Sequence, residues 1–240
     1  MICNTFLNSS KKLALLIDPD KHTSESVIHV SRIAEALKVD YIFVGGSILM
    51  TSIEHTVQYI KAYYNGPVLL FPGNSCQVSQ NADAILFLSL LSGRNAEFLI
   101  GNHVISAPRI KQIGLEVIPT GYILINCGRV TSVEYMSNTQ PIPSDKPDIA
   151  IATALAGEML GLKCLYLEGG SGAETPVPES IIKGVRENCS IPLIVGGGIR
   201  SSEQLLQIYN AGADIAVVGT AIEKNQSLLQ KLIEVRNSLQ

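Results

Sequence analysis

The sequence contains little charge and no excess of positive charge. Only 16% of its 240 residues are charged, and 18 Lys and Arg against 21 Asp and Glu leave a formal net charge of -3. Chains that bind nucleic acid usually carry a positive field that attracts phosphates. The charge balance therefore argues against nucleic acid as a partner.

Paired cysteines and a membrane-spanning segment are also missing. The five cysteines are odd in number and none belongs to a C-x-x-C pair, so we expect reduced thiols in a cytoplasmic protein. No basic start leads into an apolar stretch of signal-peptide length, and no targeting segment is expected. The most apolar window, residues 149–167, includes Glu158 and Lys163, which argues against a transmembrane helix.

Several common catalytic motifs are absent. The sequence has no G-x-S-x-G, H-E-x-x-H or G-x-x-x-x-G-K-[ST] segment, which argues against the commonest hydrolases and nucleotide-dependent enzymes. None of the four histidines, His22, His29, His55 and His103, has a partner at metal-ligand spacing. We expect these histidines to be structural.

What the chain does contain is a regular alternation of short apolar runs and helical patterns. The runs are nearly continuous in Val, Ile, Leu and Tyr, which is typical of parallel strands covered on both faces. We expect strands at residues 13–18, 40–44, 67–71, 83–87, 116–125, 164–168, 191–195 and 214–218. Apolar residues at three- and four-residue spacing predict helices at 24–38, 52–64, 96–112, 148–161, 179–188, 202–211 and 225–238.

This order predicts an α/β fold, a (β/α)₈ TIM barrel formed by residues 1–240 as one domain, with an open doubly wound sheet as the alternative. Only residues 72–82 separate the third and fourth strands, so we expect a short or missing third helix. Residues 128–147 lack clear periodicity, and the proline-rich part from 138 to 147 predicts irregular structure. Such a loop is either functional or a tolerated surface insertion.

Glycines gather at the carboxyl ends of the expected strands. They follow the sixth strand at 169, 170 and 172, the seventh at 196–198 and the eighth at 219. In a barrel these ends meet at one mouth, where active sites lie. Backbone N–H groups of such loops bind anions, so the pattern predicts a phosphate site, with simple tight turns as the alternative.

Two carboxylates end buried strands and are candidates for chemistry. Asp18 would offer a hard oxygen ligand to Mg²⁺. The alternative for Asp18 and for Asp20 is a role only as a turn or capping residue. Glu168 would accept a proton from a bound hydroxyl. The alternative for Glu168 is an ion pair with a neighbour such as Lys21.

Five motifs together resemble the geranylgeranylglyceryl phosphate synthase family, which includes the heptaprenylglyceryl phosphate synthases. They are DPDK at 18–21, VGGS at 44–47, YLEGGSGA at 166–173, VGGGIR at 195–200 and VGT at 218–220. The resemblance covers nearly the whole chain, and YLEGGSGA is its most specific part. Leu16 stands where Bacillus-type members carry a lysine, so the chain is more similar to the archaeal-type branch.

The resemblance implies a Mg²⁺-dependent prenyltransferase that joins sn-glycerol 1-phosphate to a polyprenyl diphosphate, with geranylgeranyl as the expected prenyl group. The product would be an ether-lipid precursor, and diphosphate would be released. By the same resemblance Asp18 and Ser47 bind the metal, and Glu168 orients or deprotonates the attacking hydroxyl. The residues implied for binding glycerol phosphate are Tyr166, Leu167, Glu168, Gly169, Gly170, Ser171, Gly172, Gly197, Gly198, Gly219 and Thr220.

Further expectations follow from a lipid substrate. The barrel wall beside the short third connection is expected to open a groove for the apolar tail. We also expect a homo-oligomer and contact with a membrane surface. Two other functions stay open: a phosphosugar isomerase or lyase with paired acid and base residues, and a non-catalytic subunit that binds a phosphometabolite.

Overall fold

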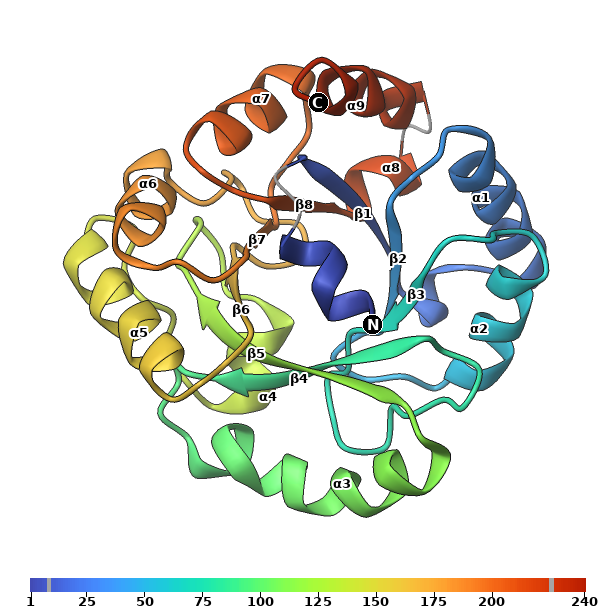
Figure 1. The fold of residues 1–240 in the computed structure, drawn as a ribbon, viewed down its shortest axis with the longest axis horizontal. Coiled ribbons are helices and arrows are strands. Elements are labelled where there is room, and N and C mark those ends of the chain that lie inside the picture. Colours follow the sequence, from blue (N-terminus) through green and yellow to red (C-terminus); the bar gives the residue numbers. More distant parts are fainter. Residues whose placement is uncertain (8–9, 225–226) are drawn as a thin grey trace.

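The computed structural model describes residues 1–7, 10–224 and 227–240. Eight parallel strands close into a barrel in the order of the chain, with the helices around the outside (Figure 1). The predicted TIM barrel is confirmed, and the open doubly wound sheet is wrong. The strands are β1 (Lys12–Ile17), β2 (Tyr41–Val44), β3 (Val68–Leu70), β4 (Ala84–Leu90), β5 (Glu116–Leu124), β6 (Cys164–Glu168), β7 (Leu193–Gly196) and β8 (Ile215–Val218).

The helices that surround the barrel match the expected amphipathic segments. They are α1 (Ser24–Ala36), α2 (Ile53–Lys61), α3 (Asn102–Ile113), α5 (Pro147–Met159), α6 (Glu179–Asn188), α7 (Ser202–Asn210) and α9 (Ser227–Asn237), with a π-helical turn η3 (Glu97–Gly101) before α3. The expected start of the last helix, Asn225, lies outside the described residues. No helix among the described residues is long and apolar enough to cross a bilayer.

The connection between β3 and β4 contains no helix within residues 71–83, which confirms the prediction for the third helix. Gln77 holds this connection against the loop after β2. Its Nε2 donates to the Gly46 carbonyl at 2.7 Å, and its Oε1 accepts from the Gly73 N–H at 3.0 Å. The two neighbouring loops at this side of the mouth are therefore joined by one buried side chain.

The segment 128–147 is more ordered than its sequence predicts. It contains the short helix α4 (Ser132–Ser137), which the periodicity did not predict. The proline-rich part is irregular as expected, because residues 138–146 form no helix or strand apart from an isolated bridge at Ile142. The Thr131 hydroxyl accepts from the Glu134 N–H at 3.2 Å, and the Glu134 carboxylate accepts from the Thr131 N–H at 3.4 Å. This Thr-x-x-Glu capping box is the local signal that periodicity alone missed. A second unexpected helix, α8 (Thr220–Lys224), follows β8.

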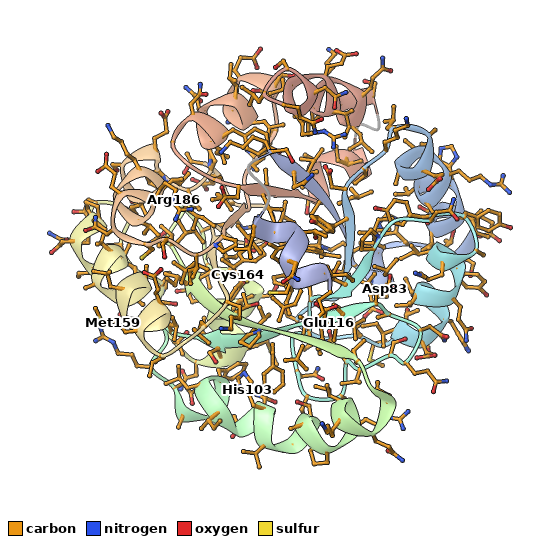
Figure 2. The ribbon with its side chains drawn as sticks, in the orientation of Figure 1. Asp83, His103, Glu116, Met159, Cys164 and Arg186 are labelled. Carbon is orange, nitrogen blue, oxygen red and sulfur yellow. The ribbon has the colours of Figure 1, made fainter. Side chains whose placement is uncertain are left out.

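The barrel interior is packed with aromatic rings from its amino-terminal end to its mouth. The 3₁₀ turn η1 (Ile2–Leu7) lies over the amino-terminal opening at the centre of Figure 1, and Phe6 packs edge-on against Tyr41 at 5.3 Å. Phe43 and Phe71 continue the stack at 6.4 Å. The backbone N–H groups of residues 2 and 3 donate to Glu116, the first residue of β5 (Figure 2). The chemistry is therefore confined to the opposite, carboxyl end of the barrel.

The amino-terminal end of the barrel is held by a repeated aspartate arrangement. One aspartate lies directly before each of the strands β2, β4 and β8. Its carboxylate accepts a hydrogen bond, at 2.8–2.9 Å, from a backbone N–H of the strand that comes before it in the chain. These residues are Asp40, Asp83 and Asp214. Each of these carboxylates also pairs with a basic side chain of a helix. The partners are Arg236 at 2.6 Å, Lys61 at 2.8 Å and Arg186 at 3.0 Å. This end of the barrel therefore has a structural role.

Candidate active site

The loops after β1, β6 and β8 meet at the mouth of the barrel. The Lys21 ammonium in the turn η2 (Pro19–Lys21) lies 3.2 Å from Asp18 Oδ2 and 3.4 Å from Ser171 Oγ. Ser171 Oγ in turn lies 3.2 Å from Thr220 Oγ1. Asp18, Ser171 and Thr220, which the sequence marked as site residues, are therefore brought together through Lys21.

Asp18 lies next to the loop that carries Ser47. A Cβ atom at Gly46 would lie 3.0 Å from Asp18 Oδ1, so the loop after β2 passes directly over the carboxylate. Asp18 Oδ1 also accepts from the Asp20 N–H at 3.2 Å, which caps the turn η2. Asp18 thus has a local capping role in addition to its position in the mouth.

Asp20 has a different, structural role. Its carboxylate accepts from the N–H groups of Met50 and Thr51 at 2.8 and 2.7 Å. These hydrogen bonds, first the one from Met50, lower the pKa of Asp20. Asp20 therefore holds the loop between β2 and α2, which agrees with the structural alternative.

The side-chain oxygens of Asp18 and Ser47 are the donor type that one kind of metal ion prefers. The described residues contain no group of three or more His, Cys, Asp or Glu side chains that would cage a metal. Mg²⁺ does not need such a cage, because it keeps several waters and takes phosphate oxygens as ligands. One carboxylate and one neighbouring hydroxyl fit this mode of binding.

Glu168 is buried at the end of β6, with only 5% of its surface exposed. Burial raises the pKa of Glu168 to about 7, against the opposing effects of the Gly170 N–H and the nearby hydroxyls of Tyr166 and Tyr122. The alternative of an ion pair with Lys21 is wrong, because Lys21 contacts Asp18. A carboxyl group with a pKa near neutrality is suited to take up a proton at physiological pH.

Aromatic rings form the floor beneath Glu168. Phe71 and Tyr166 stack at 5.1 Å with an interplanar angle of 15°, and Tyr122 meets both rings edge-on. The Tyr166 hydroxyl is buried and has no hydrogen-bond partner of acceptable geometry among the described residues. Phe71 and Tyr122 were not marked by the sequence, because the strand positions that face inward depend on how the barrel closes.

Backbone atoms line the mouth between the loops after β6 and β7. Gly197 has a φ of +87°, and a Cβ atom there would lie 2.7 Å from the Gly170 nitrogen and 2.8 Å from Glu168 Oε1. Only glycine fits this close approach of two chains. Of the expected contact residues, the buried Gly169 and Gly170 already use their N–H groups, on the Gly196 carbonyl at 2.9 Å and on Glu168 at 2.6 Å. Gly197 and Gly198 are only partly buried, so they are the glycines here whose backbone an anion could reach.

Two arginines that the sequence analysis did not mark flank the loop after β6. Arg200 donates to the carbonyl oxygens of Ala173 and Glu174, the latter at 3.2 Å. Arg129 lies beside this loop, since a Cβ atom at Gly172 would come within 3.2 Å of its Nη1. Arg200 was visible as the last residue of the VGGGIR motif, whereas Arg129 lies in the segment that sequence periodicity did not interpret.

The remaining expected residues lie at different distances from the mouth. The Leu167 side chain is fully buried in the core layer shared with the helices, so only its backbone is available to a ligand. Gly219 immediately precedes α8, and Thr220 is the first residue of that helix. The set predicted from the sequence is thus assembled around one mouth, with the Leu167 side chain outside it.

Comparisons with known proteins agree with this architecture. The model of the PcrB family matches residues 8–236. A geranylgeranylglyceryl phosphate synthase from Chitinophaga pinensis is 51% identical over 97% of this chain and 94% of its own length, and one from Spirosoma linguale is 48% identical over 95% and 92%.

A solved structure gives the same result. The (S)-3-O-geranylgeranylglyceryl phosphate synthase from Thermoplasma acidophilum, crystallised with its substrate sn-glycerol-1-phosphate, superposes with a TM-score of 0.94 at 32% identity, covering 99% of each chain. The similarity extends over the whole barrel. The chain therefore belongs to the PcrB family and is an enzyme of the prenyltransferase class.

Proposed function

We propose that this enzyme joins sn-glycerol 1-phosphate to a polyprenyl diphosphate, with geranylgeranyl as the expected prenyl group. The observation that carries the proposal is the buried Glu168 beside glycine-lined loops, with Asp18 at the same mouth. The names of the relatives and the glycerol phosphate bound by the Thermoplasma acidophilum protein support it.

The acceptor would lie against the loops after β6, β7 and β8. Its phosphate would be held by the backbone of Ser171 and Gly172, by Gly197 and Gly198, and by Gly219 with the Thr220 hydroxyl, while Gly169 and Gly170 fix the loop through their own hydrogen bonds. This placement leaves the glycerol hydroxyl to face Glu168, which takes its proton. Arg200 keeps the loop after β6 in place by holding its carbonyl oxygens.

Asp18 and Ser47 would hold Mg²⁺, which neutralises the diphosphate leaving group when bound. In the transfer, the bond between the allylic carbon and the diphosphate oxygen breaks, and its electron pair leaves with the diphosphate. The glycerol oxygen forms the new carbon–oxygen bond and its proton goes to Glu168.

The apolar tail would run along the barrel wall beside β3 and β4, where residues 71–83 form no helix. Homo-oligomer formation and contact with a membrane surface stay predictions of the sequence analysis. Cytoplasmic localisation is likewise an expectation from reduced cysteines.

The test is a transfer assay with purified protein, radiolabelled sn-glycerol 1-phosphate, Mg²⁺ and prenyl diphosphates of several chain lengths. Label moving into organic solvent only with metal and with the sn-1 form would support the proposal and rank the donors. The sn-3 enantiomer and EDTA are the controls. Absence of transfer with every donor, from protein shown to be folded, would favour the phosphosugar enzyme or the non-catalytic binding subunit.

A further inference from the structure

Lys21 connects two parts of the mouth that are 150 residues apart in the sequence. Its ammonium lies 3.2 Å from Asp18 Oδ2 and 3.4 Å from Ser171 Oγ. The Asp18 side chain is 19% exposed and the Lys21 side chain 42%. Lys21 therefore reaches from the turn after β1 to the glycine loop after β6, with its amine still open to solvent.

An exposed ion pair three residues apart usually contributes little to stability. The contacts of Lys21 point to a role in ligand binding and not in stability. One partner, Asp18, is the carboxylate proposed to hold the metal, and the other, Ser171, belongs to the proposed acceptor loop. A lysine ammonium has three N–H donors. One of them is directed at Ser171, and the ammonium pairs with the Asp18 carboxylate, which leaves donor capacity for an oxygen of a ligand between the two loops.

We propose that Lys21 is a substrate-binding residue that contacts the diphosphate of the prenyl donor, an inference that rests on the proposed function. With a metal ion on Asp18, the carboxylate charge is shared with the metal, and the ammonium is available to a diphosphate oxygen. A single divalent ion leaves a prenyl diphosphate with net negative charge. A compact cation next to the metal position complements that remaining charge.

The two arginines near the mouth are less suited to this contact. Arg200 uses its guanidinium on carbonyl oxygens of residues 172–174. Arg129 lies beside Gly172 in the loop after β6. Lys21, in contrast, contacts the Asp18 carboxylate directly, and the diphosphate is expected on that side of the mouth.

The first test measures binding of inorganic pyrophosphate with Mg²⁺ by titration calorimetry, which needs no turnover. Lys21→Met should weaken binding by about tenfold or more, the usual effect of losing a charge-assisted hydrogen bond, and Lys21→Arg should restore part of it. Lys183→Met is the matched control, because Lys183 forms an exposed pair with Glu187 at 3.9 Å on α6. It should bind pyrophosphate like the wild type.

The second test separates the two substrates. Lys21→Met should raise KM for the prenyl diphosphate about tenfold and leave KM for sn-glycerol 1-phosphate within about twofold of the wild type. Thermal unfolding confirms that each variant is folded. Unchanged pyrophosphate binding, or a KM increase confined to glycerol phosphate, would overturn the assignment. The wild type could also bind pyrophosphate more tightly than Lys21→Met and yet transfer no prenyl group. That result would overturn the proposed function, but the contact between Lys21 and the anion would stand.

Discussion

The carboxylate of Glu168 accepts a hydrogen bond from the backbone N–H of Gly170 at 2.6 Å. This contact ties the proposed base to the first turn of the loop proposed to hold the acceptor. Gly197 packs against both groups from the neighbouring loop. The position of the base and the shape of the anion site are therefore set by the same contact.

Replacing Glu168 with glutamine should slow the chemical step while leaving binding intact. Glutamine keeps an oxygen for the Gly170 N–H but cannot take up the proton, and loss of a general base costs about 10²- to 10⁴-fold in rate. We expect kcat to fall by that factor with little change in either KM. Wild-type kcat should also fall as the pH drops below about 7, the raised pKa of Glu168. Full activity of the variant would remove Glu168 as the base.

The same substitution should change the pH dependence of stability. The folded protein holds the Glu168 proton more tightly than the unfolded chain, because burial raises the pKa from 4.5 to about 7. The stabilisation is full below pH 4.5 and is lost as the pH rises through 7. From pH 4 to 8 the unfolding free energy of Glu168→Gln should rise relative to the wild type by up to about 3 kcal/mol. Urea unfolding at each pH measures this difference. Unfolding free energies that change with pH by the same amount in both proteins would contradict a buried, proton-binding carboxyl at Glu168.

Asparagine at position 18 should impair metal-dependent turnover far more than acceptor binding. The amide keeps the shape of the side chain and can still accept from the Asp20 N–H, but it lacks the charge that binds Mg²⁺. We expect the Mg²⁺ concentration for half-maximal turnover to rise about tenfold or more. Binding of sn-glycerol 1-phosphate, measured by calorimetry, should change little. A parallel loss of acceptor binding and turnover would show that Asp18 does not act through the metal.

Replacing Gly197 with alanine should damage the anion site because the new Cβ atom clashes with the loop after β6. This effect comes in addition to the strain of an alanine with a positive φ. Gly161 is a matched control, because both glycines have a φ of +87° but a Cβ atom at Gly161 meets nothing within 4 Å. The backbone strain of about 1 kcal/mol is then common to both variants. We expect Gly197→Ala to raise KM for glycerol phosphate by about tenfold or more, while Gly161→Ala loses only stability. Equal kinetics in the two variants would exclude a role for the close packing at Gly197.

The sequence alone determined the barrel and the location of its mouth. Eight continuous apolar runs with helices between them encode parallel strands buried on both faces, and this pattern is local to each segment. The glycines that follow β6, β7 and β8 were likewise visible without a structure. Even the missing third helix followed from the length of residues 72–82, because a crossover helix needs more chain.

The tertiary structure decided how the side chains at the mouth are paired. The Lys21 ammonium contacts Asp18 and Ser171 and not Glu168. The rings of Phe71 and Tyr122 pack together beneath the proposed base, Glu168. These contacts join segments far apart in the chain, so no local period or spacing encodes them. They arise when the barrel closes, because closure sets which strand positions point inward and which loops meet. The raised pKa of Glu168 has the same origin, since burial of a side chain is a property of the closed barrel.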